Sequence, residues 1–523
     1  MRSRRLDDAR LAALLLAGAL AGCSAAPSGD PAAVARAPAA APEDAGPSWP
    51  CWSGPFGTFA AAPSDRPLLD DLNKARLVWK SAEAVPPAKS QSMRVGAKNL
   101  EKLAGGGGSS PVVSGGLVFL SFFVPSGDVV DEGFVDRERE LGREADPGQW
   151  RIDADDVLVA IDAATGKTAW RRVFPGRGIN WHDAKAGPCN VTPCVAGGRL
   201  FAIGSTGRVT CVDARTGADV WQSDLGKRHR AIEALKAECL RRRSFDGHST
   251  FNRDFGGAPV VLDGVLVLPD FDGNPCGLLG LDAATGAALW RVPKATAQDA
   301  IPARWVRDGR AYAVTATPAG KVFCTEARTG RVLWTLGASG HNSRSVVVQD
   351  DWLLLNVGPV PDSAFGLKLP PLSVSRLAAM KLTPEGPVKG WELPDGYGCP
   401  RHNPVVAREG HAWARLEKRT VCIELASGRV VAEVPAVGDG IGFFALAGDR
   451  LLLDRDGAHN ETELHLYDAD PARFAALGAP WKPPHPPTTS YGVAMAHPVV
   501  DGRIYIRGAD ALYCYDLAAP RAD

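Results

Sequence analysis

A turn pattern, Asp/Glu-x-x-Thr-Gly-x-x-x-Trp, occurs four times in this chain of 523 residues and constrains its fold more than any other feature. In each copy the acidic residue and the threonine can bond nearby backbone N–H groups, and the glycine supplies the positive φ of a tight corner. An alternating apolar segment precedes each copy, so the pattern predicts a β-hairpin. The four copies occupy residues 162–170, 213–221, 282–290 and 326–334.

Weaker copies of the same turn extend the repeat along the chain. They lie at residues 424–432, around 386–391, and near Asp468 and Asp516. Ala432 stands where the tryptophan is expected, which predicts looser packing of that unit. A proline at the first position of a strand, where its missing N–H lies outside the ladder, marks the start of most units. These starts are Pro111, Pro193, Pro259, Pro404 and Pro498, with weaker starts at Pro302, Ser345 and near Gly442.

Eight starts and eight hairpins predict an all-β fold, a closed β-propeller of about eight four-stranded blades. The last unit supplies only three strands before the chain reaches Tyr515, and residues 75–80 supply an N-terminal strand that completes this last blade. Such closure leaves no long free sheet edge. Seven blades are the alternative, because the units at residues 350–391 and 442–468 match the pattern poorly.

The N-terminus carries the features of an export signal. Basic residues are followed by a short apolar run at residues 11–21. The end of this run forms the first half of the segment Leu20-Ala21-Gly22-Cys23. This arrangement resembles the lipobox of bacterial lipoproteins, which implies that Cys23 is a lipid anchor on the periplasmic side of the outer membrane. An ordinary signal peptide with an incidental cysteine is the alternative. We therefore expect a signal peptide at residues 1–22, an Ala/Pro-rich tether at 23–47 and one propeller domain at 48–520.

Charge and cysteine usage narrow the function further. Lys plus Arg equals Asp plus Glu at 59 each, and this zero net charge argues against a nucleic-acid partner. Four of the eleven cysteines stand two residues before the acidic turn residue of different units, so we expect them to be buried core residues without disulfides. These four are Cys211, Cys324, Cys422 and Cys514.

The repeats resemble the quinoprotein-type propeller family, with pyrroloquinoline-quinone-like repeats, over essentially residues 49–520. In that family the turn and its tryptophan dock neighbouring blades. The resemblance therefore implies a blade-docking role for Trp79, Trp170, Trp221, Trp290 and Trp334.

Two kinds of relative suggest different functions. Quinoprotein alcohol dehydrogenases hold pyrroloquinoline quinone and Ca²⁺ at the axis beside a disulfide between adjacent cysteines, whereas the propeller lipoprotein of the outer-membrane β-barrel assembly machinery has an anchor cysteine and no cofactor. This chain has no Cys-Cys pair and no Cys-x-x-Cys-His motif. We therefore predict a non-catalytic envelope lipoprotein that serves as a protein-interaction scaffold. The alternatives are a quinoprotein-type oxidoreductase that binds pyrroloquinoline quinone and Ca²⁺, or a sensor of small ligands at the propeller axis.

Extra chain length falls between second and third strands or between units, and in a propeller both kinds of connection emerge on one face. We expect this face to contact partner proteins. Residues that precede inner strands on this face are candidates for an axial ligand site, with an anion or a transition metal favoured over Ca²⁺. The alternative is that they only hydrogen-bond the connecting backbone. The candidates are His341, Arg344, His402, Asn403 and His497.

The single-domain interpretation predicts the outcome of limited proteolysis. We expect the mature protein to yield one resistant core that begins near Trp49, because a closed ring of blades has no internal boundary where few contacts cross. Mass spectrometry of the digest measures this. Two or more separable, stable fragments would contradict the single propeller.

Overall fold

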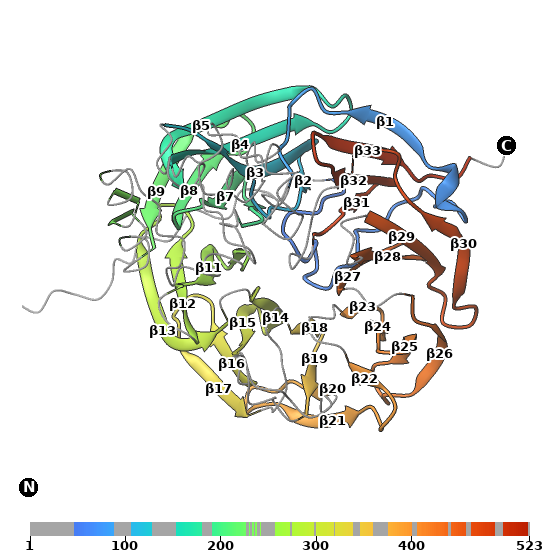
Figure 1. Ribbon diagram of the computed structural model, residues 1–523. Coiled ribbons are helices and arrows are strands. Elements are labelled where there is room, and N and C mark those ends of the chain that lie inside the picture. Colours follow the sequence, from blue (N-terminus) through green and yellow to red (C-terminus); the bar gives the residue numbers. More distant parts are fainter. Residues whose placement is uncertain are drawn as a thin grey trace, which may run out of the picture. The chain divides into compact units, whose positions relative to one another are not determined.

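The computed structural model describes most of the chain from Gly46 to Pro520. The described ranges are 46–87, 106–127, 153–179, 191–225, 257–271, 275–297, 300–317, 320–337, 346–358, 375–399, 405–437, 441–456, 462–486 and 495–520, with residues 230, 233, 234, 236, 237 and 241. Their strands form eight antiparallel sheets arranged in a ring (Figure 1). The fold is the all-β propeller that the repeats predict, with eight blades rather than seven.

Each blade has four strands, listed from the axis outward. Blade 1 has β2 (Val112–Ser114), β3 (Leu117–Pro125), β4 (Asp153–Asp162) and β5 (Thr168–Ile179); blade 2 has β6 (Cys194–Ala196), β7 (Arg199–Ile203), β8 (Arg208–Asp213) and β9 (Asp219–Asp224). Blade 3 has β10 (Val260–Leu262), β11 (Val265–Pro269), β12 (Cys276–Asp282) and β13 (Ala288–Thr296); blade 4 has β14 (Ala303–Arg307), β15 (Arg310–Ala316), β16 (Lys321–Glu326) and β17 (Val332–Gly337).

The second half of the ring follows the same order. Blade 5 has β18 (Val347–Gln349), β19 (Trp352–Val357), β20 (Ser375–Lys381) and β21 (Val388–Glu392), with β22 (Gly398–Cys399) also paired to β20; blade 6 has β23 (Val405–Arg408), β24 (His411–Arg415), β25 (Arg419–Glu424) and β26 (Val430–Pro435). Blade 7 has β27 (Ile441–Ala447), β28 (Arg450–Asp456), β29 (Thr462–Asp468) and β30 (Ala475–Trp481); blade 8 has β31 (Val499–Val500), β32 (Arg503–Arg507), β33 (Leu512–Asp516) and β1 (Arg76–Lys80).

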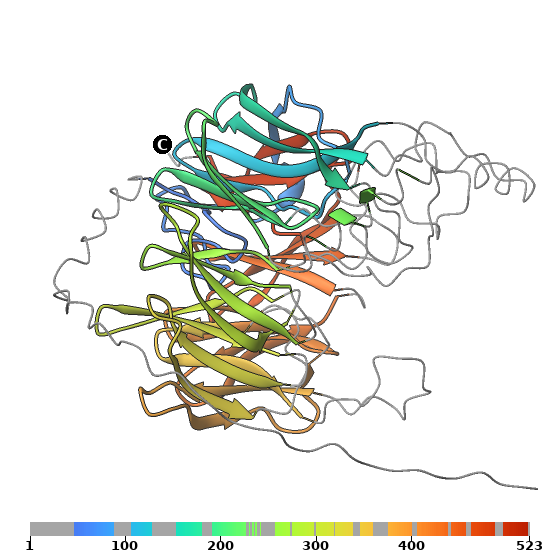
Figure 2. The same ribbon diagram turned by 90° about the vertical axis from the view of Figure 1, so that its left-hand side faces the viewer.

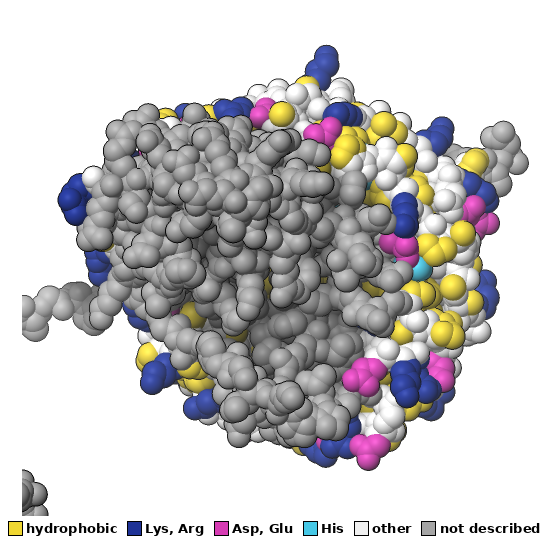
Figure 3. All heavy atoms as spheres, in the orientation of Figure 1, with side chains coloured by type: hydrophobic (Ala, Val, Ile, Leu, Met, Phe, Trp, Pro, Cys, Tyr) yellow, Lys and Arg dark blue, Asp and Glu magenta, His cyan; other side chains and the backbone are white. Residues whose placement is uncertain are grey.

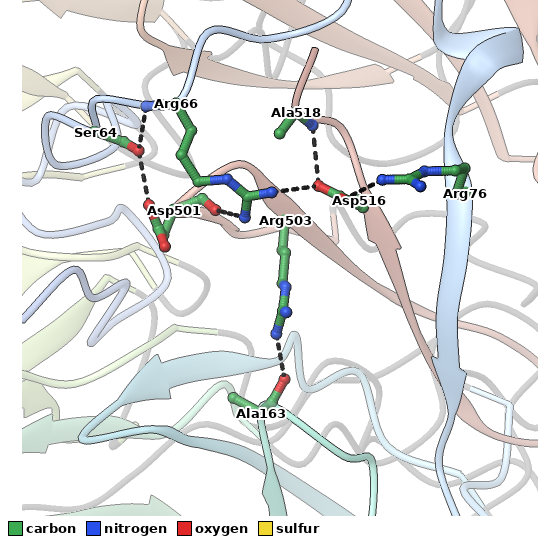
Figure 4. Close-up of polar contacts among 8 residues, drawn as sticks. All are labelled: Ser64, Arg66, Arg76, Ala163, Asp501, Arg503, Asp516 and Ala518. Carbon is green, nitrogen blue, oxygen red and sulfur yellow. Dashed lines mark hydrogen bonds and ion pairs between the residues drawn. The ribbon is translucent and has the colours of Figure 1, made fainter. Parts of the chain in front are cut away.

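Strand β1 joins the two ends of the described chain in blade 8. It pairs antiparallel with β33, with Arg76 opposite Asp516 and Lys80 opposite Tyr513. Figure 4 shows how side chains reinforce this junction on one face of the blade: Arg66 reaches Asp516 at 3.1 Å, and Arg76 reaches the other carboxylate oxygen of Asp516 at 3.0 Å. Residues some 440 positions apart in sequence are thus held in one sheet.

The repeated turn has the hydrogen bonds that its sequence predicts. In blade 1, the Asp162 carboxylate accepts from the backbone N–H of Thr165 at 2.8 Å and from its hydroxyl at 2.7 Å. These bonds from Thr165 hold the pKa of Asp162 below its usual value. Gly166 closes the turn at φ +72°. The equivalent residues of blade 2, Asp213 and Thr216, make the same bonds.

The tryptophans of the outer strands contact this turn in the next blade. The indole N–H donates to the carbonyl that follows the acidic turn residue, which ties each outer strand to its neighbour. The pairs are Trp79 with Ala163 (3.1 Å), Trp170 with Ala214 (2.9 Å), Trp221 with Ala283 (3.1 Å), Trp290 with Ala327 (2.9 Å) and Trp391 with Leu425 (2.6 Å). Trp334 is also buried, but its N–H has no partner among the described residues.

The four cysteines of the repeat are core residues. Each is fully buried, and none forms a disulfide, which confirms the prediction. Burial raises the pKa of Cys211 to about 12, so this thiol stays protonated and unreactive at neutral pH. They are Cys211, Cys324, Cys422 and Cys514.

The two faces of the ring differ, as the side view in Figure 2 makes clear. The turns between first and second strands and between third and fourth strands emerge on one face, which we call the hairpin face. These turns are short, as at Gly115–Gly116 and residues 162–167. The connections between second and third strands and between blades emerge on the opposite face, which we call the loop face.

Residues 49–61 cap the axis at the hairpin face. Trp49 exchanges two hydrogen bonds with Val113 of β2, and Pro50 accepts one from Val195 of β6. Eight residues later Thr58 accepts from Ala407 of β23, and Phe59 accepts from a residue of β27. Blades 2 and 6 lie opposite each other in an eight-membered ring, so this segment crosses the axis. We call residues 49–61 the cap.

The docking of Trp290 can be tested at Gly330, the glycine on which its indole rests. A Cβ at Gly330 would lie 2.5 Å from the ring of Trp290, whereas a Cβ at Gly309 would meet nothing within 4 Å; their φ values are +70° and +71°. We expect Gly309→Ala to lower the free energy of unfolding by about 1 kcal/mol through backbone strain. Gly330→Ala should cost about 1–3 kcal/mol more, because the indole must move. Urea unfolding measures both, and equal losses would contradict the docking role.

Candidate functional site

The loop face carries the long connections. The chain leaves the described ranges between β3 and β4, between β19 and β20, and between several blades, such as from β9 to β10. All these positions lie on the loop face, whereas every turn on the hairpin face is described. Around the rim seen in Figure 3, Lys and Arg side chains stand out at more places than Asp and Glu side chains, although the composition of the whole chain is balanced.

His497 is the one candidate for the axial site that lies within the described residues. It lies two residues before the inner strand of blade 8, is 2% exposed, and contacts Asp454 of β28 in blade 7, with 2.7 Å between Nε2 and Oδ2. The Phe443 ring lies edge-on to its imidazole at 6.2 Å. His341, Arg344, His402 and Asn403 lie outside the described residues. The five-residue ligand site therefore stays a prediction.

The His497 and Asp454 pair leaves two buried atoms without hydrogen bonds. Within the described part of the chain, neither His497 Nδ1 nor Asp454 Oδ1 has a partner. When Nε2 donates to the carboxylate, Nδ1 carries a lone pair, so both atoms are acceptors. The same arrangement orients histidines that ligate metals. It favours a cation or a hydrogen-bond donor at this position, and it does not favour an anion.

Asp454 belongs to a set of buried polar residues at one strand position. This position is in the second strand of each blade. It lies opposite the third-strand residue that stands four positions before the turn residue. In blades 2, 3 and 4 this residue is Ile203, Pro269 or Ala316. In the other five blades it is polar and at least nine-tenths buried. We call these five the polar arc: Asn356, Arg415, Asp454, Arg507 and Ser121.

Arg507 shows what a residue of the polar arc does. It is fully buried in blade 8, and burial lowers its pKa to about 9. Its guanidinium donates to the carbonyls of Pro86 (2.8 Å), Gly107 (2.7 Å) and Ser109 (2.9 Å). Pro86 follows β1, and the other two precede β2 of blade 1. Arg507 therefore ties the last blade to the first near the loop face.

The interface between blades 1 and 2 is also polar. Asp156 of β4 is buried and accepts from the Ser205 hydroxyl of blade 2 at 2.8 Å. A cavity of about 20 Å³ beside them, also lined by Ser121 and Thr210, has room for a single water molecule. This cavity is too small for an organic ligand. It is part of the joint between two blades.

Lys236 attaches a loop-face insertion to the ring. It lies between β9 and β10, and its ammonium is buried against blade 1. The ammonium pairs with the Asp153 carboxylate at 2.5 Å and donates to the carbonyls of Gly176 and Gly178 at 2.5 and 2.7 Å. Arg230 and Arg241 of the same insertion are exposed. Part of the loop face is thus anchored by a buried, charge-assisted contact.

A histidine and two tyrosines join blades 7 and 8 close to the loop face. His485 follows β30, stacks on Tyr513 of β33 at 4.2 Å and 11°, and bonds the Tyr515 hydroxyl at 2.9 Å. Burial, assisted by the nearby His497, lowers the pKa of His485 to about 4, with Asp510 opposing the shift. The imidazole is therefore neutral at physiological pH and has a structural role.

Metal-ligating side chains are not clustered in the described part of the chain. Within the described ranges, no three His, Cys, Asp or Glu side chains lie together so that they could hold a metal ion. No helix in the described part of the chain is long and apolar enough to cross a membrane.

Sequence reasoning missed two residues of interest. One is Asp454, the partner of His497, because no local signal links residues 43 positions apart. Arg304 of the inner strand β14 is exposed while its neighbours Ala303 and Trp305 are buried. Apolar residues alternate with other residues at the start of this strand, Ala-Arg-Trp. This alternation is the sequence pattern that predicts that Arg304 faces away from the core.

The fold is an eight-bladed β-propeller, and part of its repeat region is similar to the pyrroloquinoline-quinone-like repeat class. More particularly, residues 154–355, from β4 to β19, match the family model described as outer membrane protein assembly factor BamB. This match covers less than half of the chain. No curated protein matches the sequence.

Several solved structures resemble the model. BamB from Moraxella catarrhalis is 13% identical, with 71% of this chain and 93% of that chain covered and a TM-score of 0.44. The quinohemoprotein alcohol dehydrogenase from Comamonas testosteroni is also 13% identical, with 91% and 82% covered and a TM-score of 0.47. The computationally designed Ika8 protein is 11% identical, with 70% and 93% covered and a TM-score of 0.42.

The shifted pKa of His485 predicts an acid-dependent loss of stability. The unfolded chain binds a proton at this residue below about pH 6.5, and the folded protein only below about pH 4. Stability should therefore fall by up to about 3 kcal/mol between these values. We expect His485→Phe, which keeps a stacking ring, to unfold in urea with a flatter dependence on pH from 6.5 to 4.

Tyr515→Phe is the matched control for this variant. It removes the hydroxyl that bonds the imidazole but leaves His485 buried. Since burial is the main cause of the shift, this control should keep the acid dependence of the wild-type protein. Identical slopes for His485→Phe and the wild-type protein would contradict the assignment.

Proposed function

We propose that this chain is an envelope lipoprotein, anchored through Cys23 and exported to the periplasmic side of the outer membrane. In this proposal its propeller is a non-catalytic scaffold that binds other envelope proteins through the loop face. The single observation that carries the proposal is the division of the ring. The turns on one face are short, and the long connections between strands all leave from the other face.

The contacts between neighbouring blades support a scaffold role. Indole-to-carbonyl bonds near the hairpin face tie five of the eight blades to the next blade, and Arg507 of the polar arc ties blade 8 to blade 1 near the loop face. Loops on such a rigid frame bind partners without the entropy cost of ordering the frame itself. The family model described as outer membrane protein assembly factor BamB agrees with a role in contacting other envelope proteins. Catalysis has no comparable support in the described residues.

The proposal is tested by following the anchor and the partners in the same cells. We expect the wild-type protein to fractionate with outer membranes and to carry lipid at Cys23. Cys23→Ser should release it from membranes while leaving its melting temperature unchanged, because we expect residues 23–47 to be a tether and not part of the propeller core. A Cys23→Ser protein that stays with the membrane would contradict the anchor.

Site-specific photo-crosslinking shows which of the two faces contacts partner proteins. Crosslinkers at exposed Glu417 on the loop face and at exposed Ala426 on the hairpin face sit at opposite ends of β25 in blade 6. A scaffold that works through its loop face should give protein adducts from loop-face positions and few from Ala426. If instead pyrroloquinoline quinone with Ca²⁺ binds saturably and supports alcohol-dependent dye reduction, the oxidoreductase alternative is correct.

A further inference from the structure

The cap fixes where the chain enters the propeller. Trp49 is fully buried and bonded to Val113, the middle residue of β2, directly before the Gly115–Gly116 turn. Pro50 contacts Val195 and Thr58 contacts Ala407, each within three residues of the corresponding turn in blades 2 and 6. All these contacts lie at the hairpin-face end of inner strands. The residues before Trp49 therefore enter at the hairpin face, close to the axis.

The cap is held rigidly at this position. Trp49, Trp52, Phe59 and Phe443 form edge-to-face pairs with ring centroids 4.8 to 6.4 Å apart. The Trp49 indole also donates to the carbonyl of Trp52 at 3.3 Å. Such pairs add stability beyond the burial of their area. The cap is thus part of the core and cannot pass through the ring to the loop face without unfolding.

One large apolar side chain of the cap points outward. Residues 54–57 form a turn, closed by a hydrogen bond from the Gly57 N–H to the Gly54 carbonyl at 3.3 Å. Phe56 lies in this turn and is 50% exposed, although the neighbouring aromatic residues Trp52 and Phe59 are buried. The turn falls midway between the contacts to blade 2 and blade 6. Phe56 therefore stands near the axis on the outside of the hairpin face.

From these observations we infer that the propeller lies with its hairpin face toward the membrane and that Phe56 inserts into the lipid headgroup region. The inference rests on the proposed lipid anchor at Cys23. Some 25 residues link that anchor to Trp49, a length for which an unstructured linker has an end-to-end distance of about 25 to 30 Å. To turn the loop face to the membrane, this linker would have to pass around the rim of the ring.

A membrane-facing hairpin face has a direct consequence for the loop face. The loop face then points away from the bilayer, where periplasmic proteins or the soluble parts of membrane proteins can reach it. A single phenyl ring gives too little affinity to hold a protein at a membrane, but it can orient a protein that a lipid already anchors. The occupant of the hairpin face is thus a phospholipid surface, while proteins bind on the other side.

The orientation can be measured with one dye at two matched positions. An azide-bearing amino acid at Ala426 or at Glu417 places the dye at the hairpin-face or loop-face end of β25. The full-length lipidated protein is reconstituted into vesicles of phosphatidylethanolamine and phosphatidylglycerol that contain a headgroup-nitroxide lipid. We expect at least threefold stronger quenching of the dye at Ala426. Equal quenching, or stronger quenching at Glu417, would overturn the inference.

Two further experiments test this inference independently of the proposed anchor. Phe56→Ser should reduce the quenching ratio without lowering the melting temperature, since the side chain is half exposed. In a second protein, a hexahistidine tag replaces residues 1–23 and binds vesicles that contain a nickel-chelating lipid. A preserved ratio on these vesicles supports the orientation even if Cys23 proves not to be lipidated. A lost ratio on them, with Cys23 lipidated, refutes the orientation and leaves the anchor intact.

Discussion

The ring depends on one contact repeated between blades: an outer-strand indole that donates to a turn carbonyl of the next blade and rests on the glycine of that turn. The contact needs an indole N–H, a carbonyl left free by the turn, and a residue without Cβ, so all three are found together in the repeat. Arginine adds a second donor at two joints. Arg503 donates to the Ala163 carbonyl (Figure 4), and Arg199 donates to the Ala283 carbonyl. The same two carbonyls accept from Trp79 and Trp221.

Other groups take over at the joints where the indole contact is missing. Blade 6 has Ala432 at the tryptophan position, and Arg415 of the polar arc lies buried beside Tyr467 of blade 7, where it opposes the rise in the tyrosine pKa caused by burial. Between blades 7 and 8 the chain N-terminal to β1 provides the donor, because the Leu69 N–H bonds the Leu517 carbonyl at 2.8 Å.

Much of this architecture could be predicted from the sequence, because the turn chemistry is local. Eight blades, the buried cysteines and the strand that carries Trp79 all follow from patterns within about ten residues. The contact between His497 and Asp454, and the clamp of Arg507 on Pro86 and Gly107, could not be predicted in this way. They join different blades through side chains whose positions depend on packing, and single buried polar residues in a strand resemble ordinary exposed ones in sequence.

The same distinction between local and tertiary signals explains why the two faces were unequally predictable. The loop face is marked by insertions, which are visible in any sequence, whereas the cap is a short aromatic segment whose path across the axis depends on four inner strands. Its consequence is topological. Because the N-terminal strand must reach β33 and the cap must cross from blade 2 to blade 6 on the hairpin face, the entry of the chain is fixed opposite to the face that carries the loops.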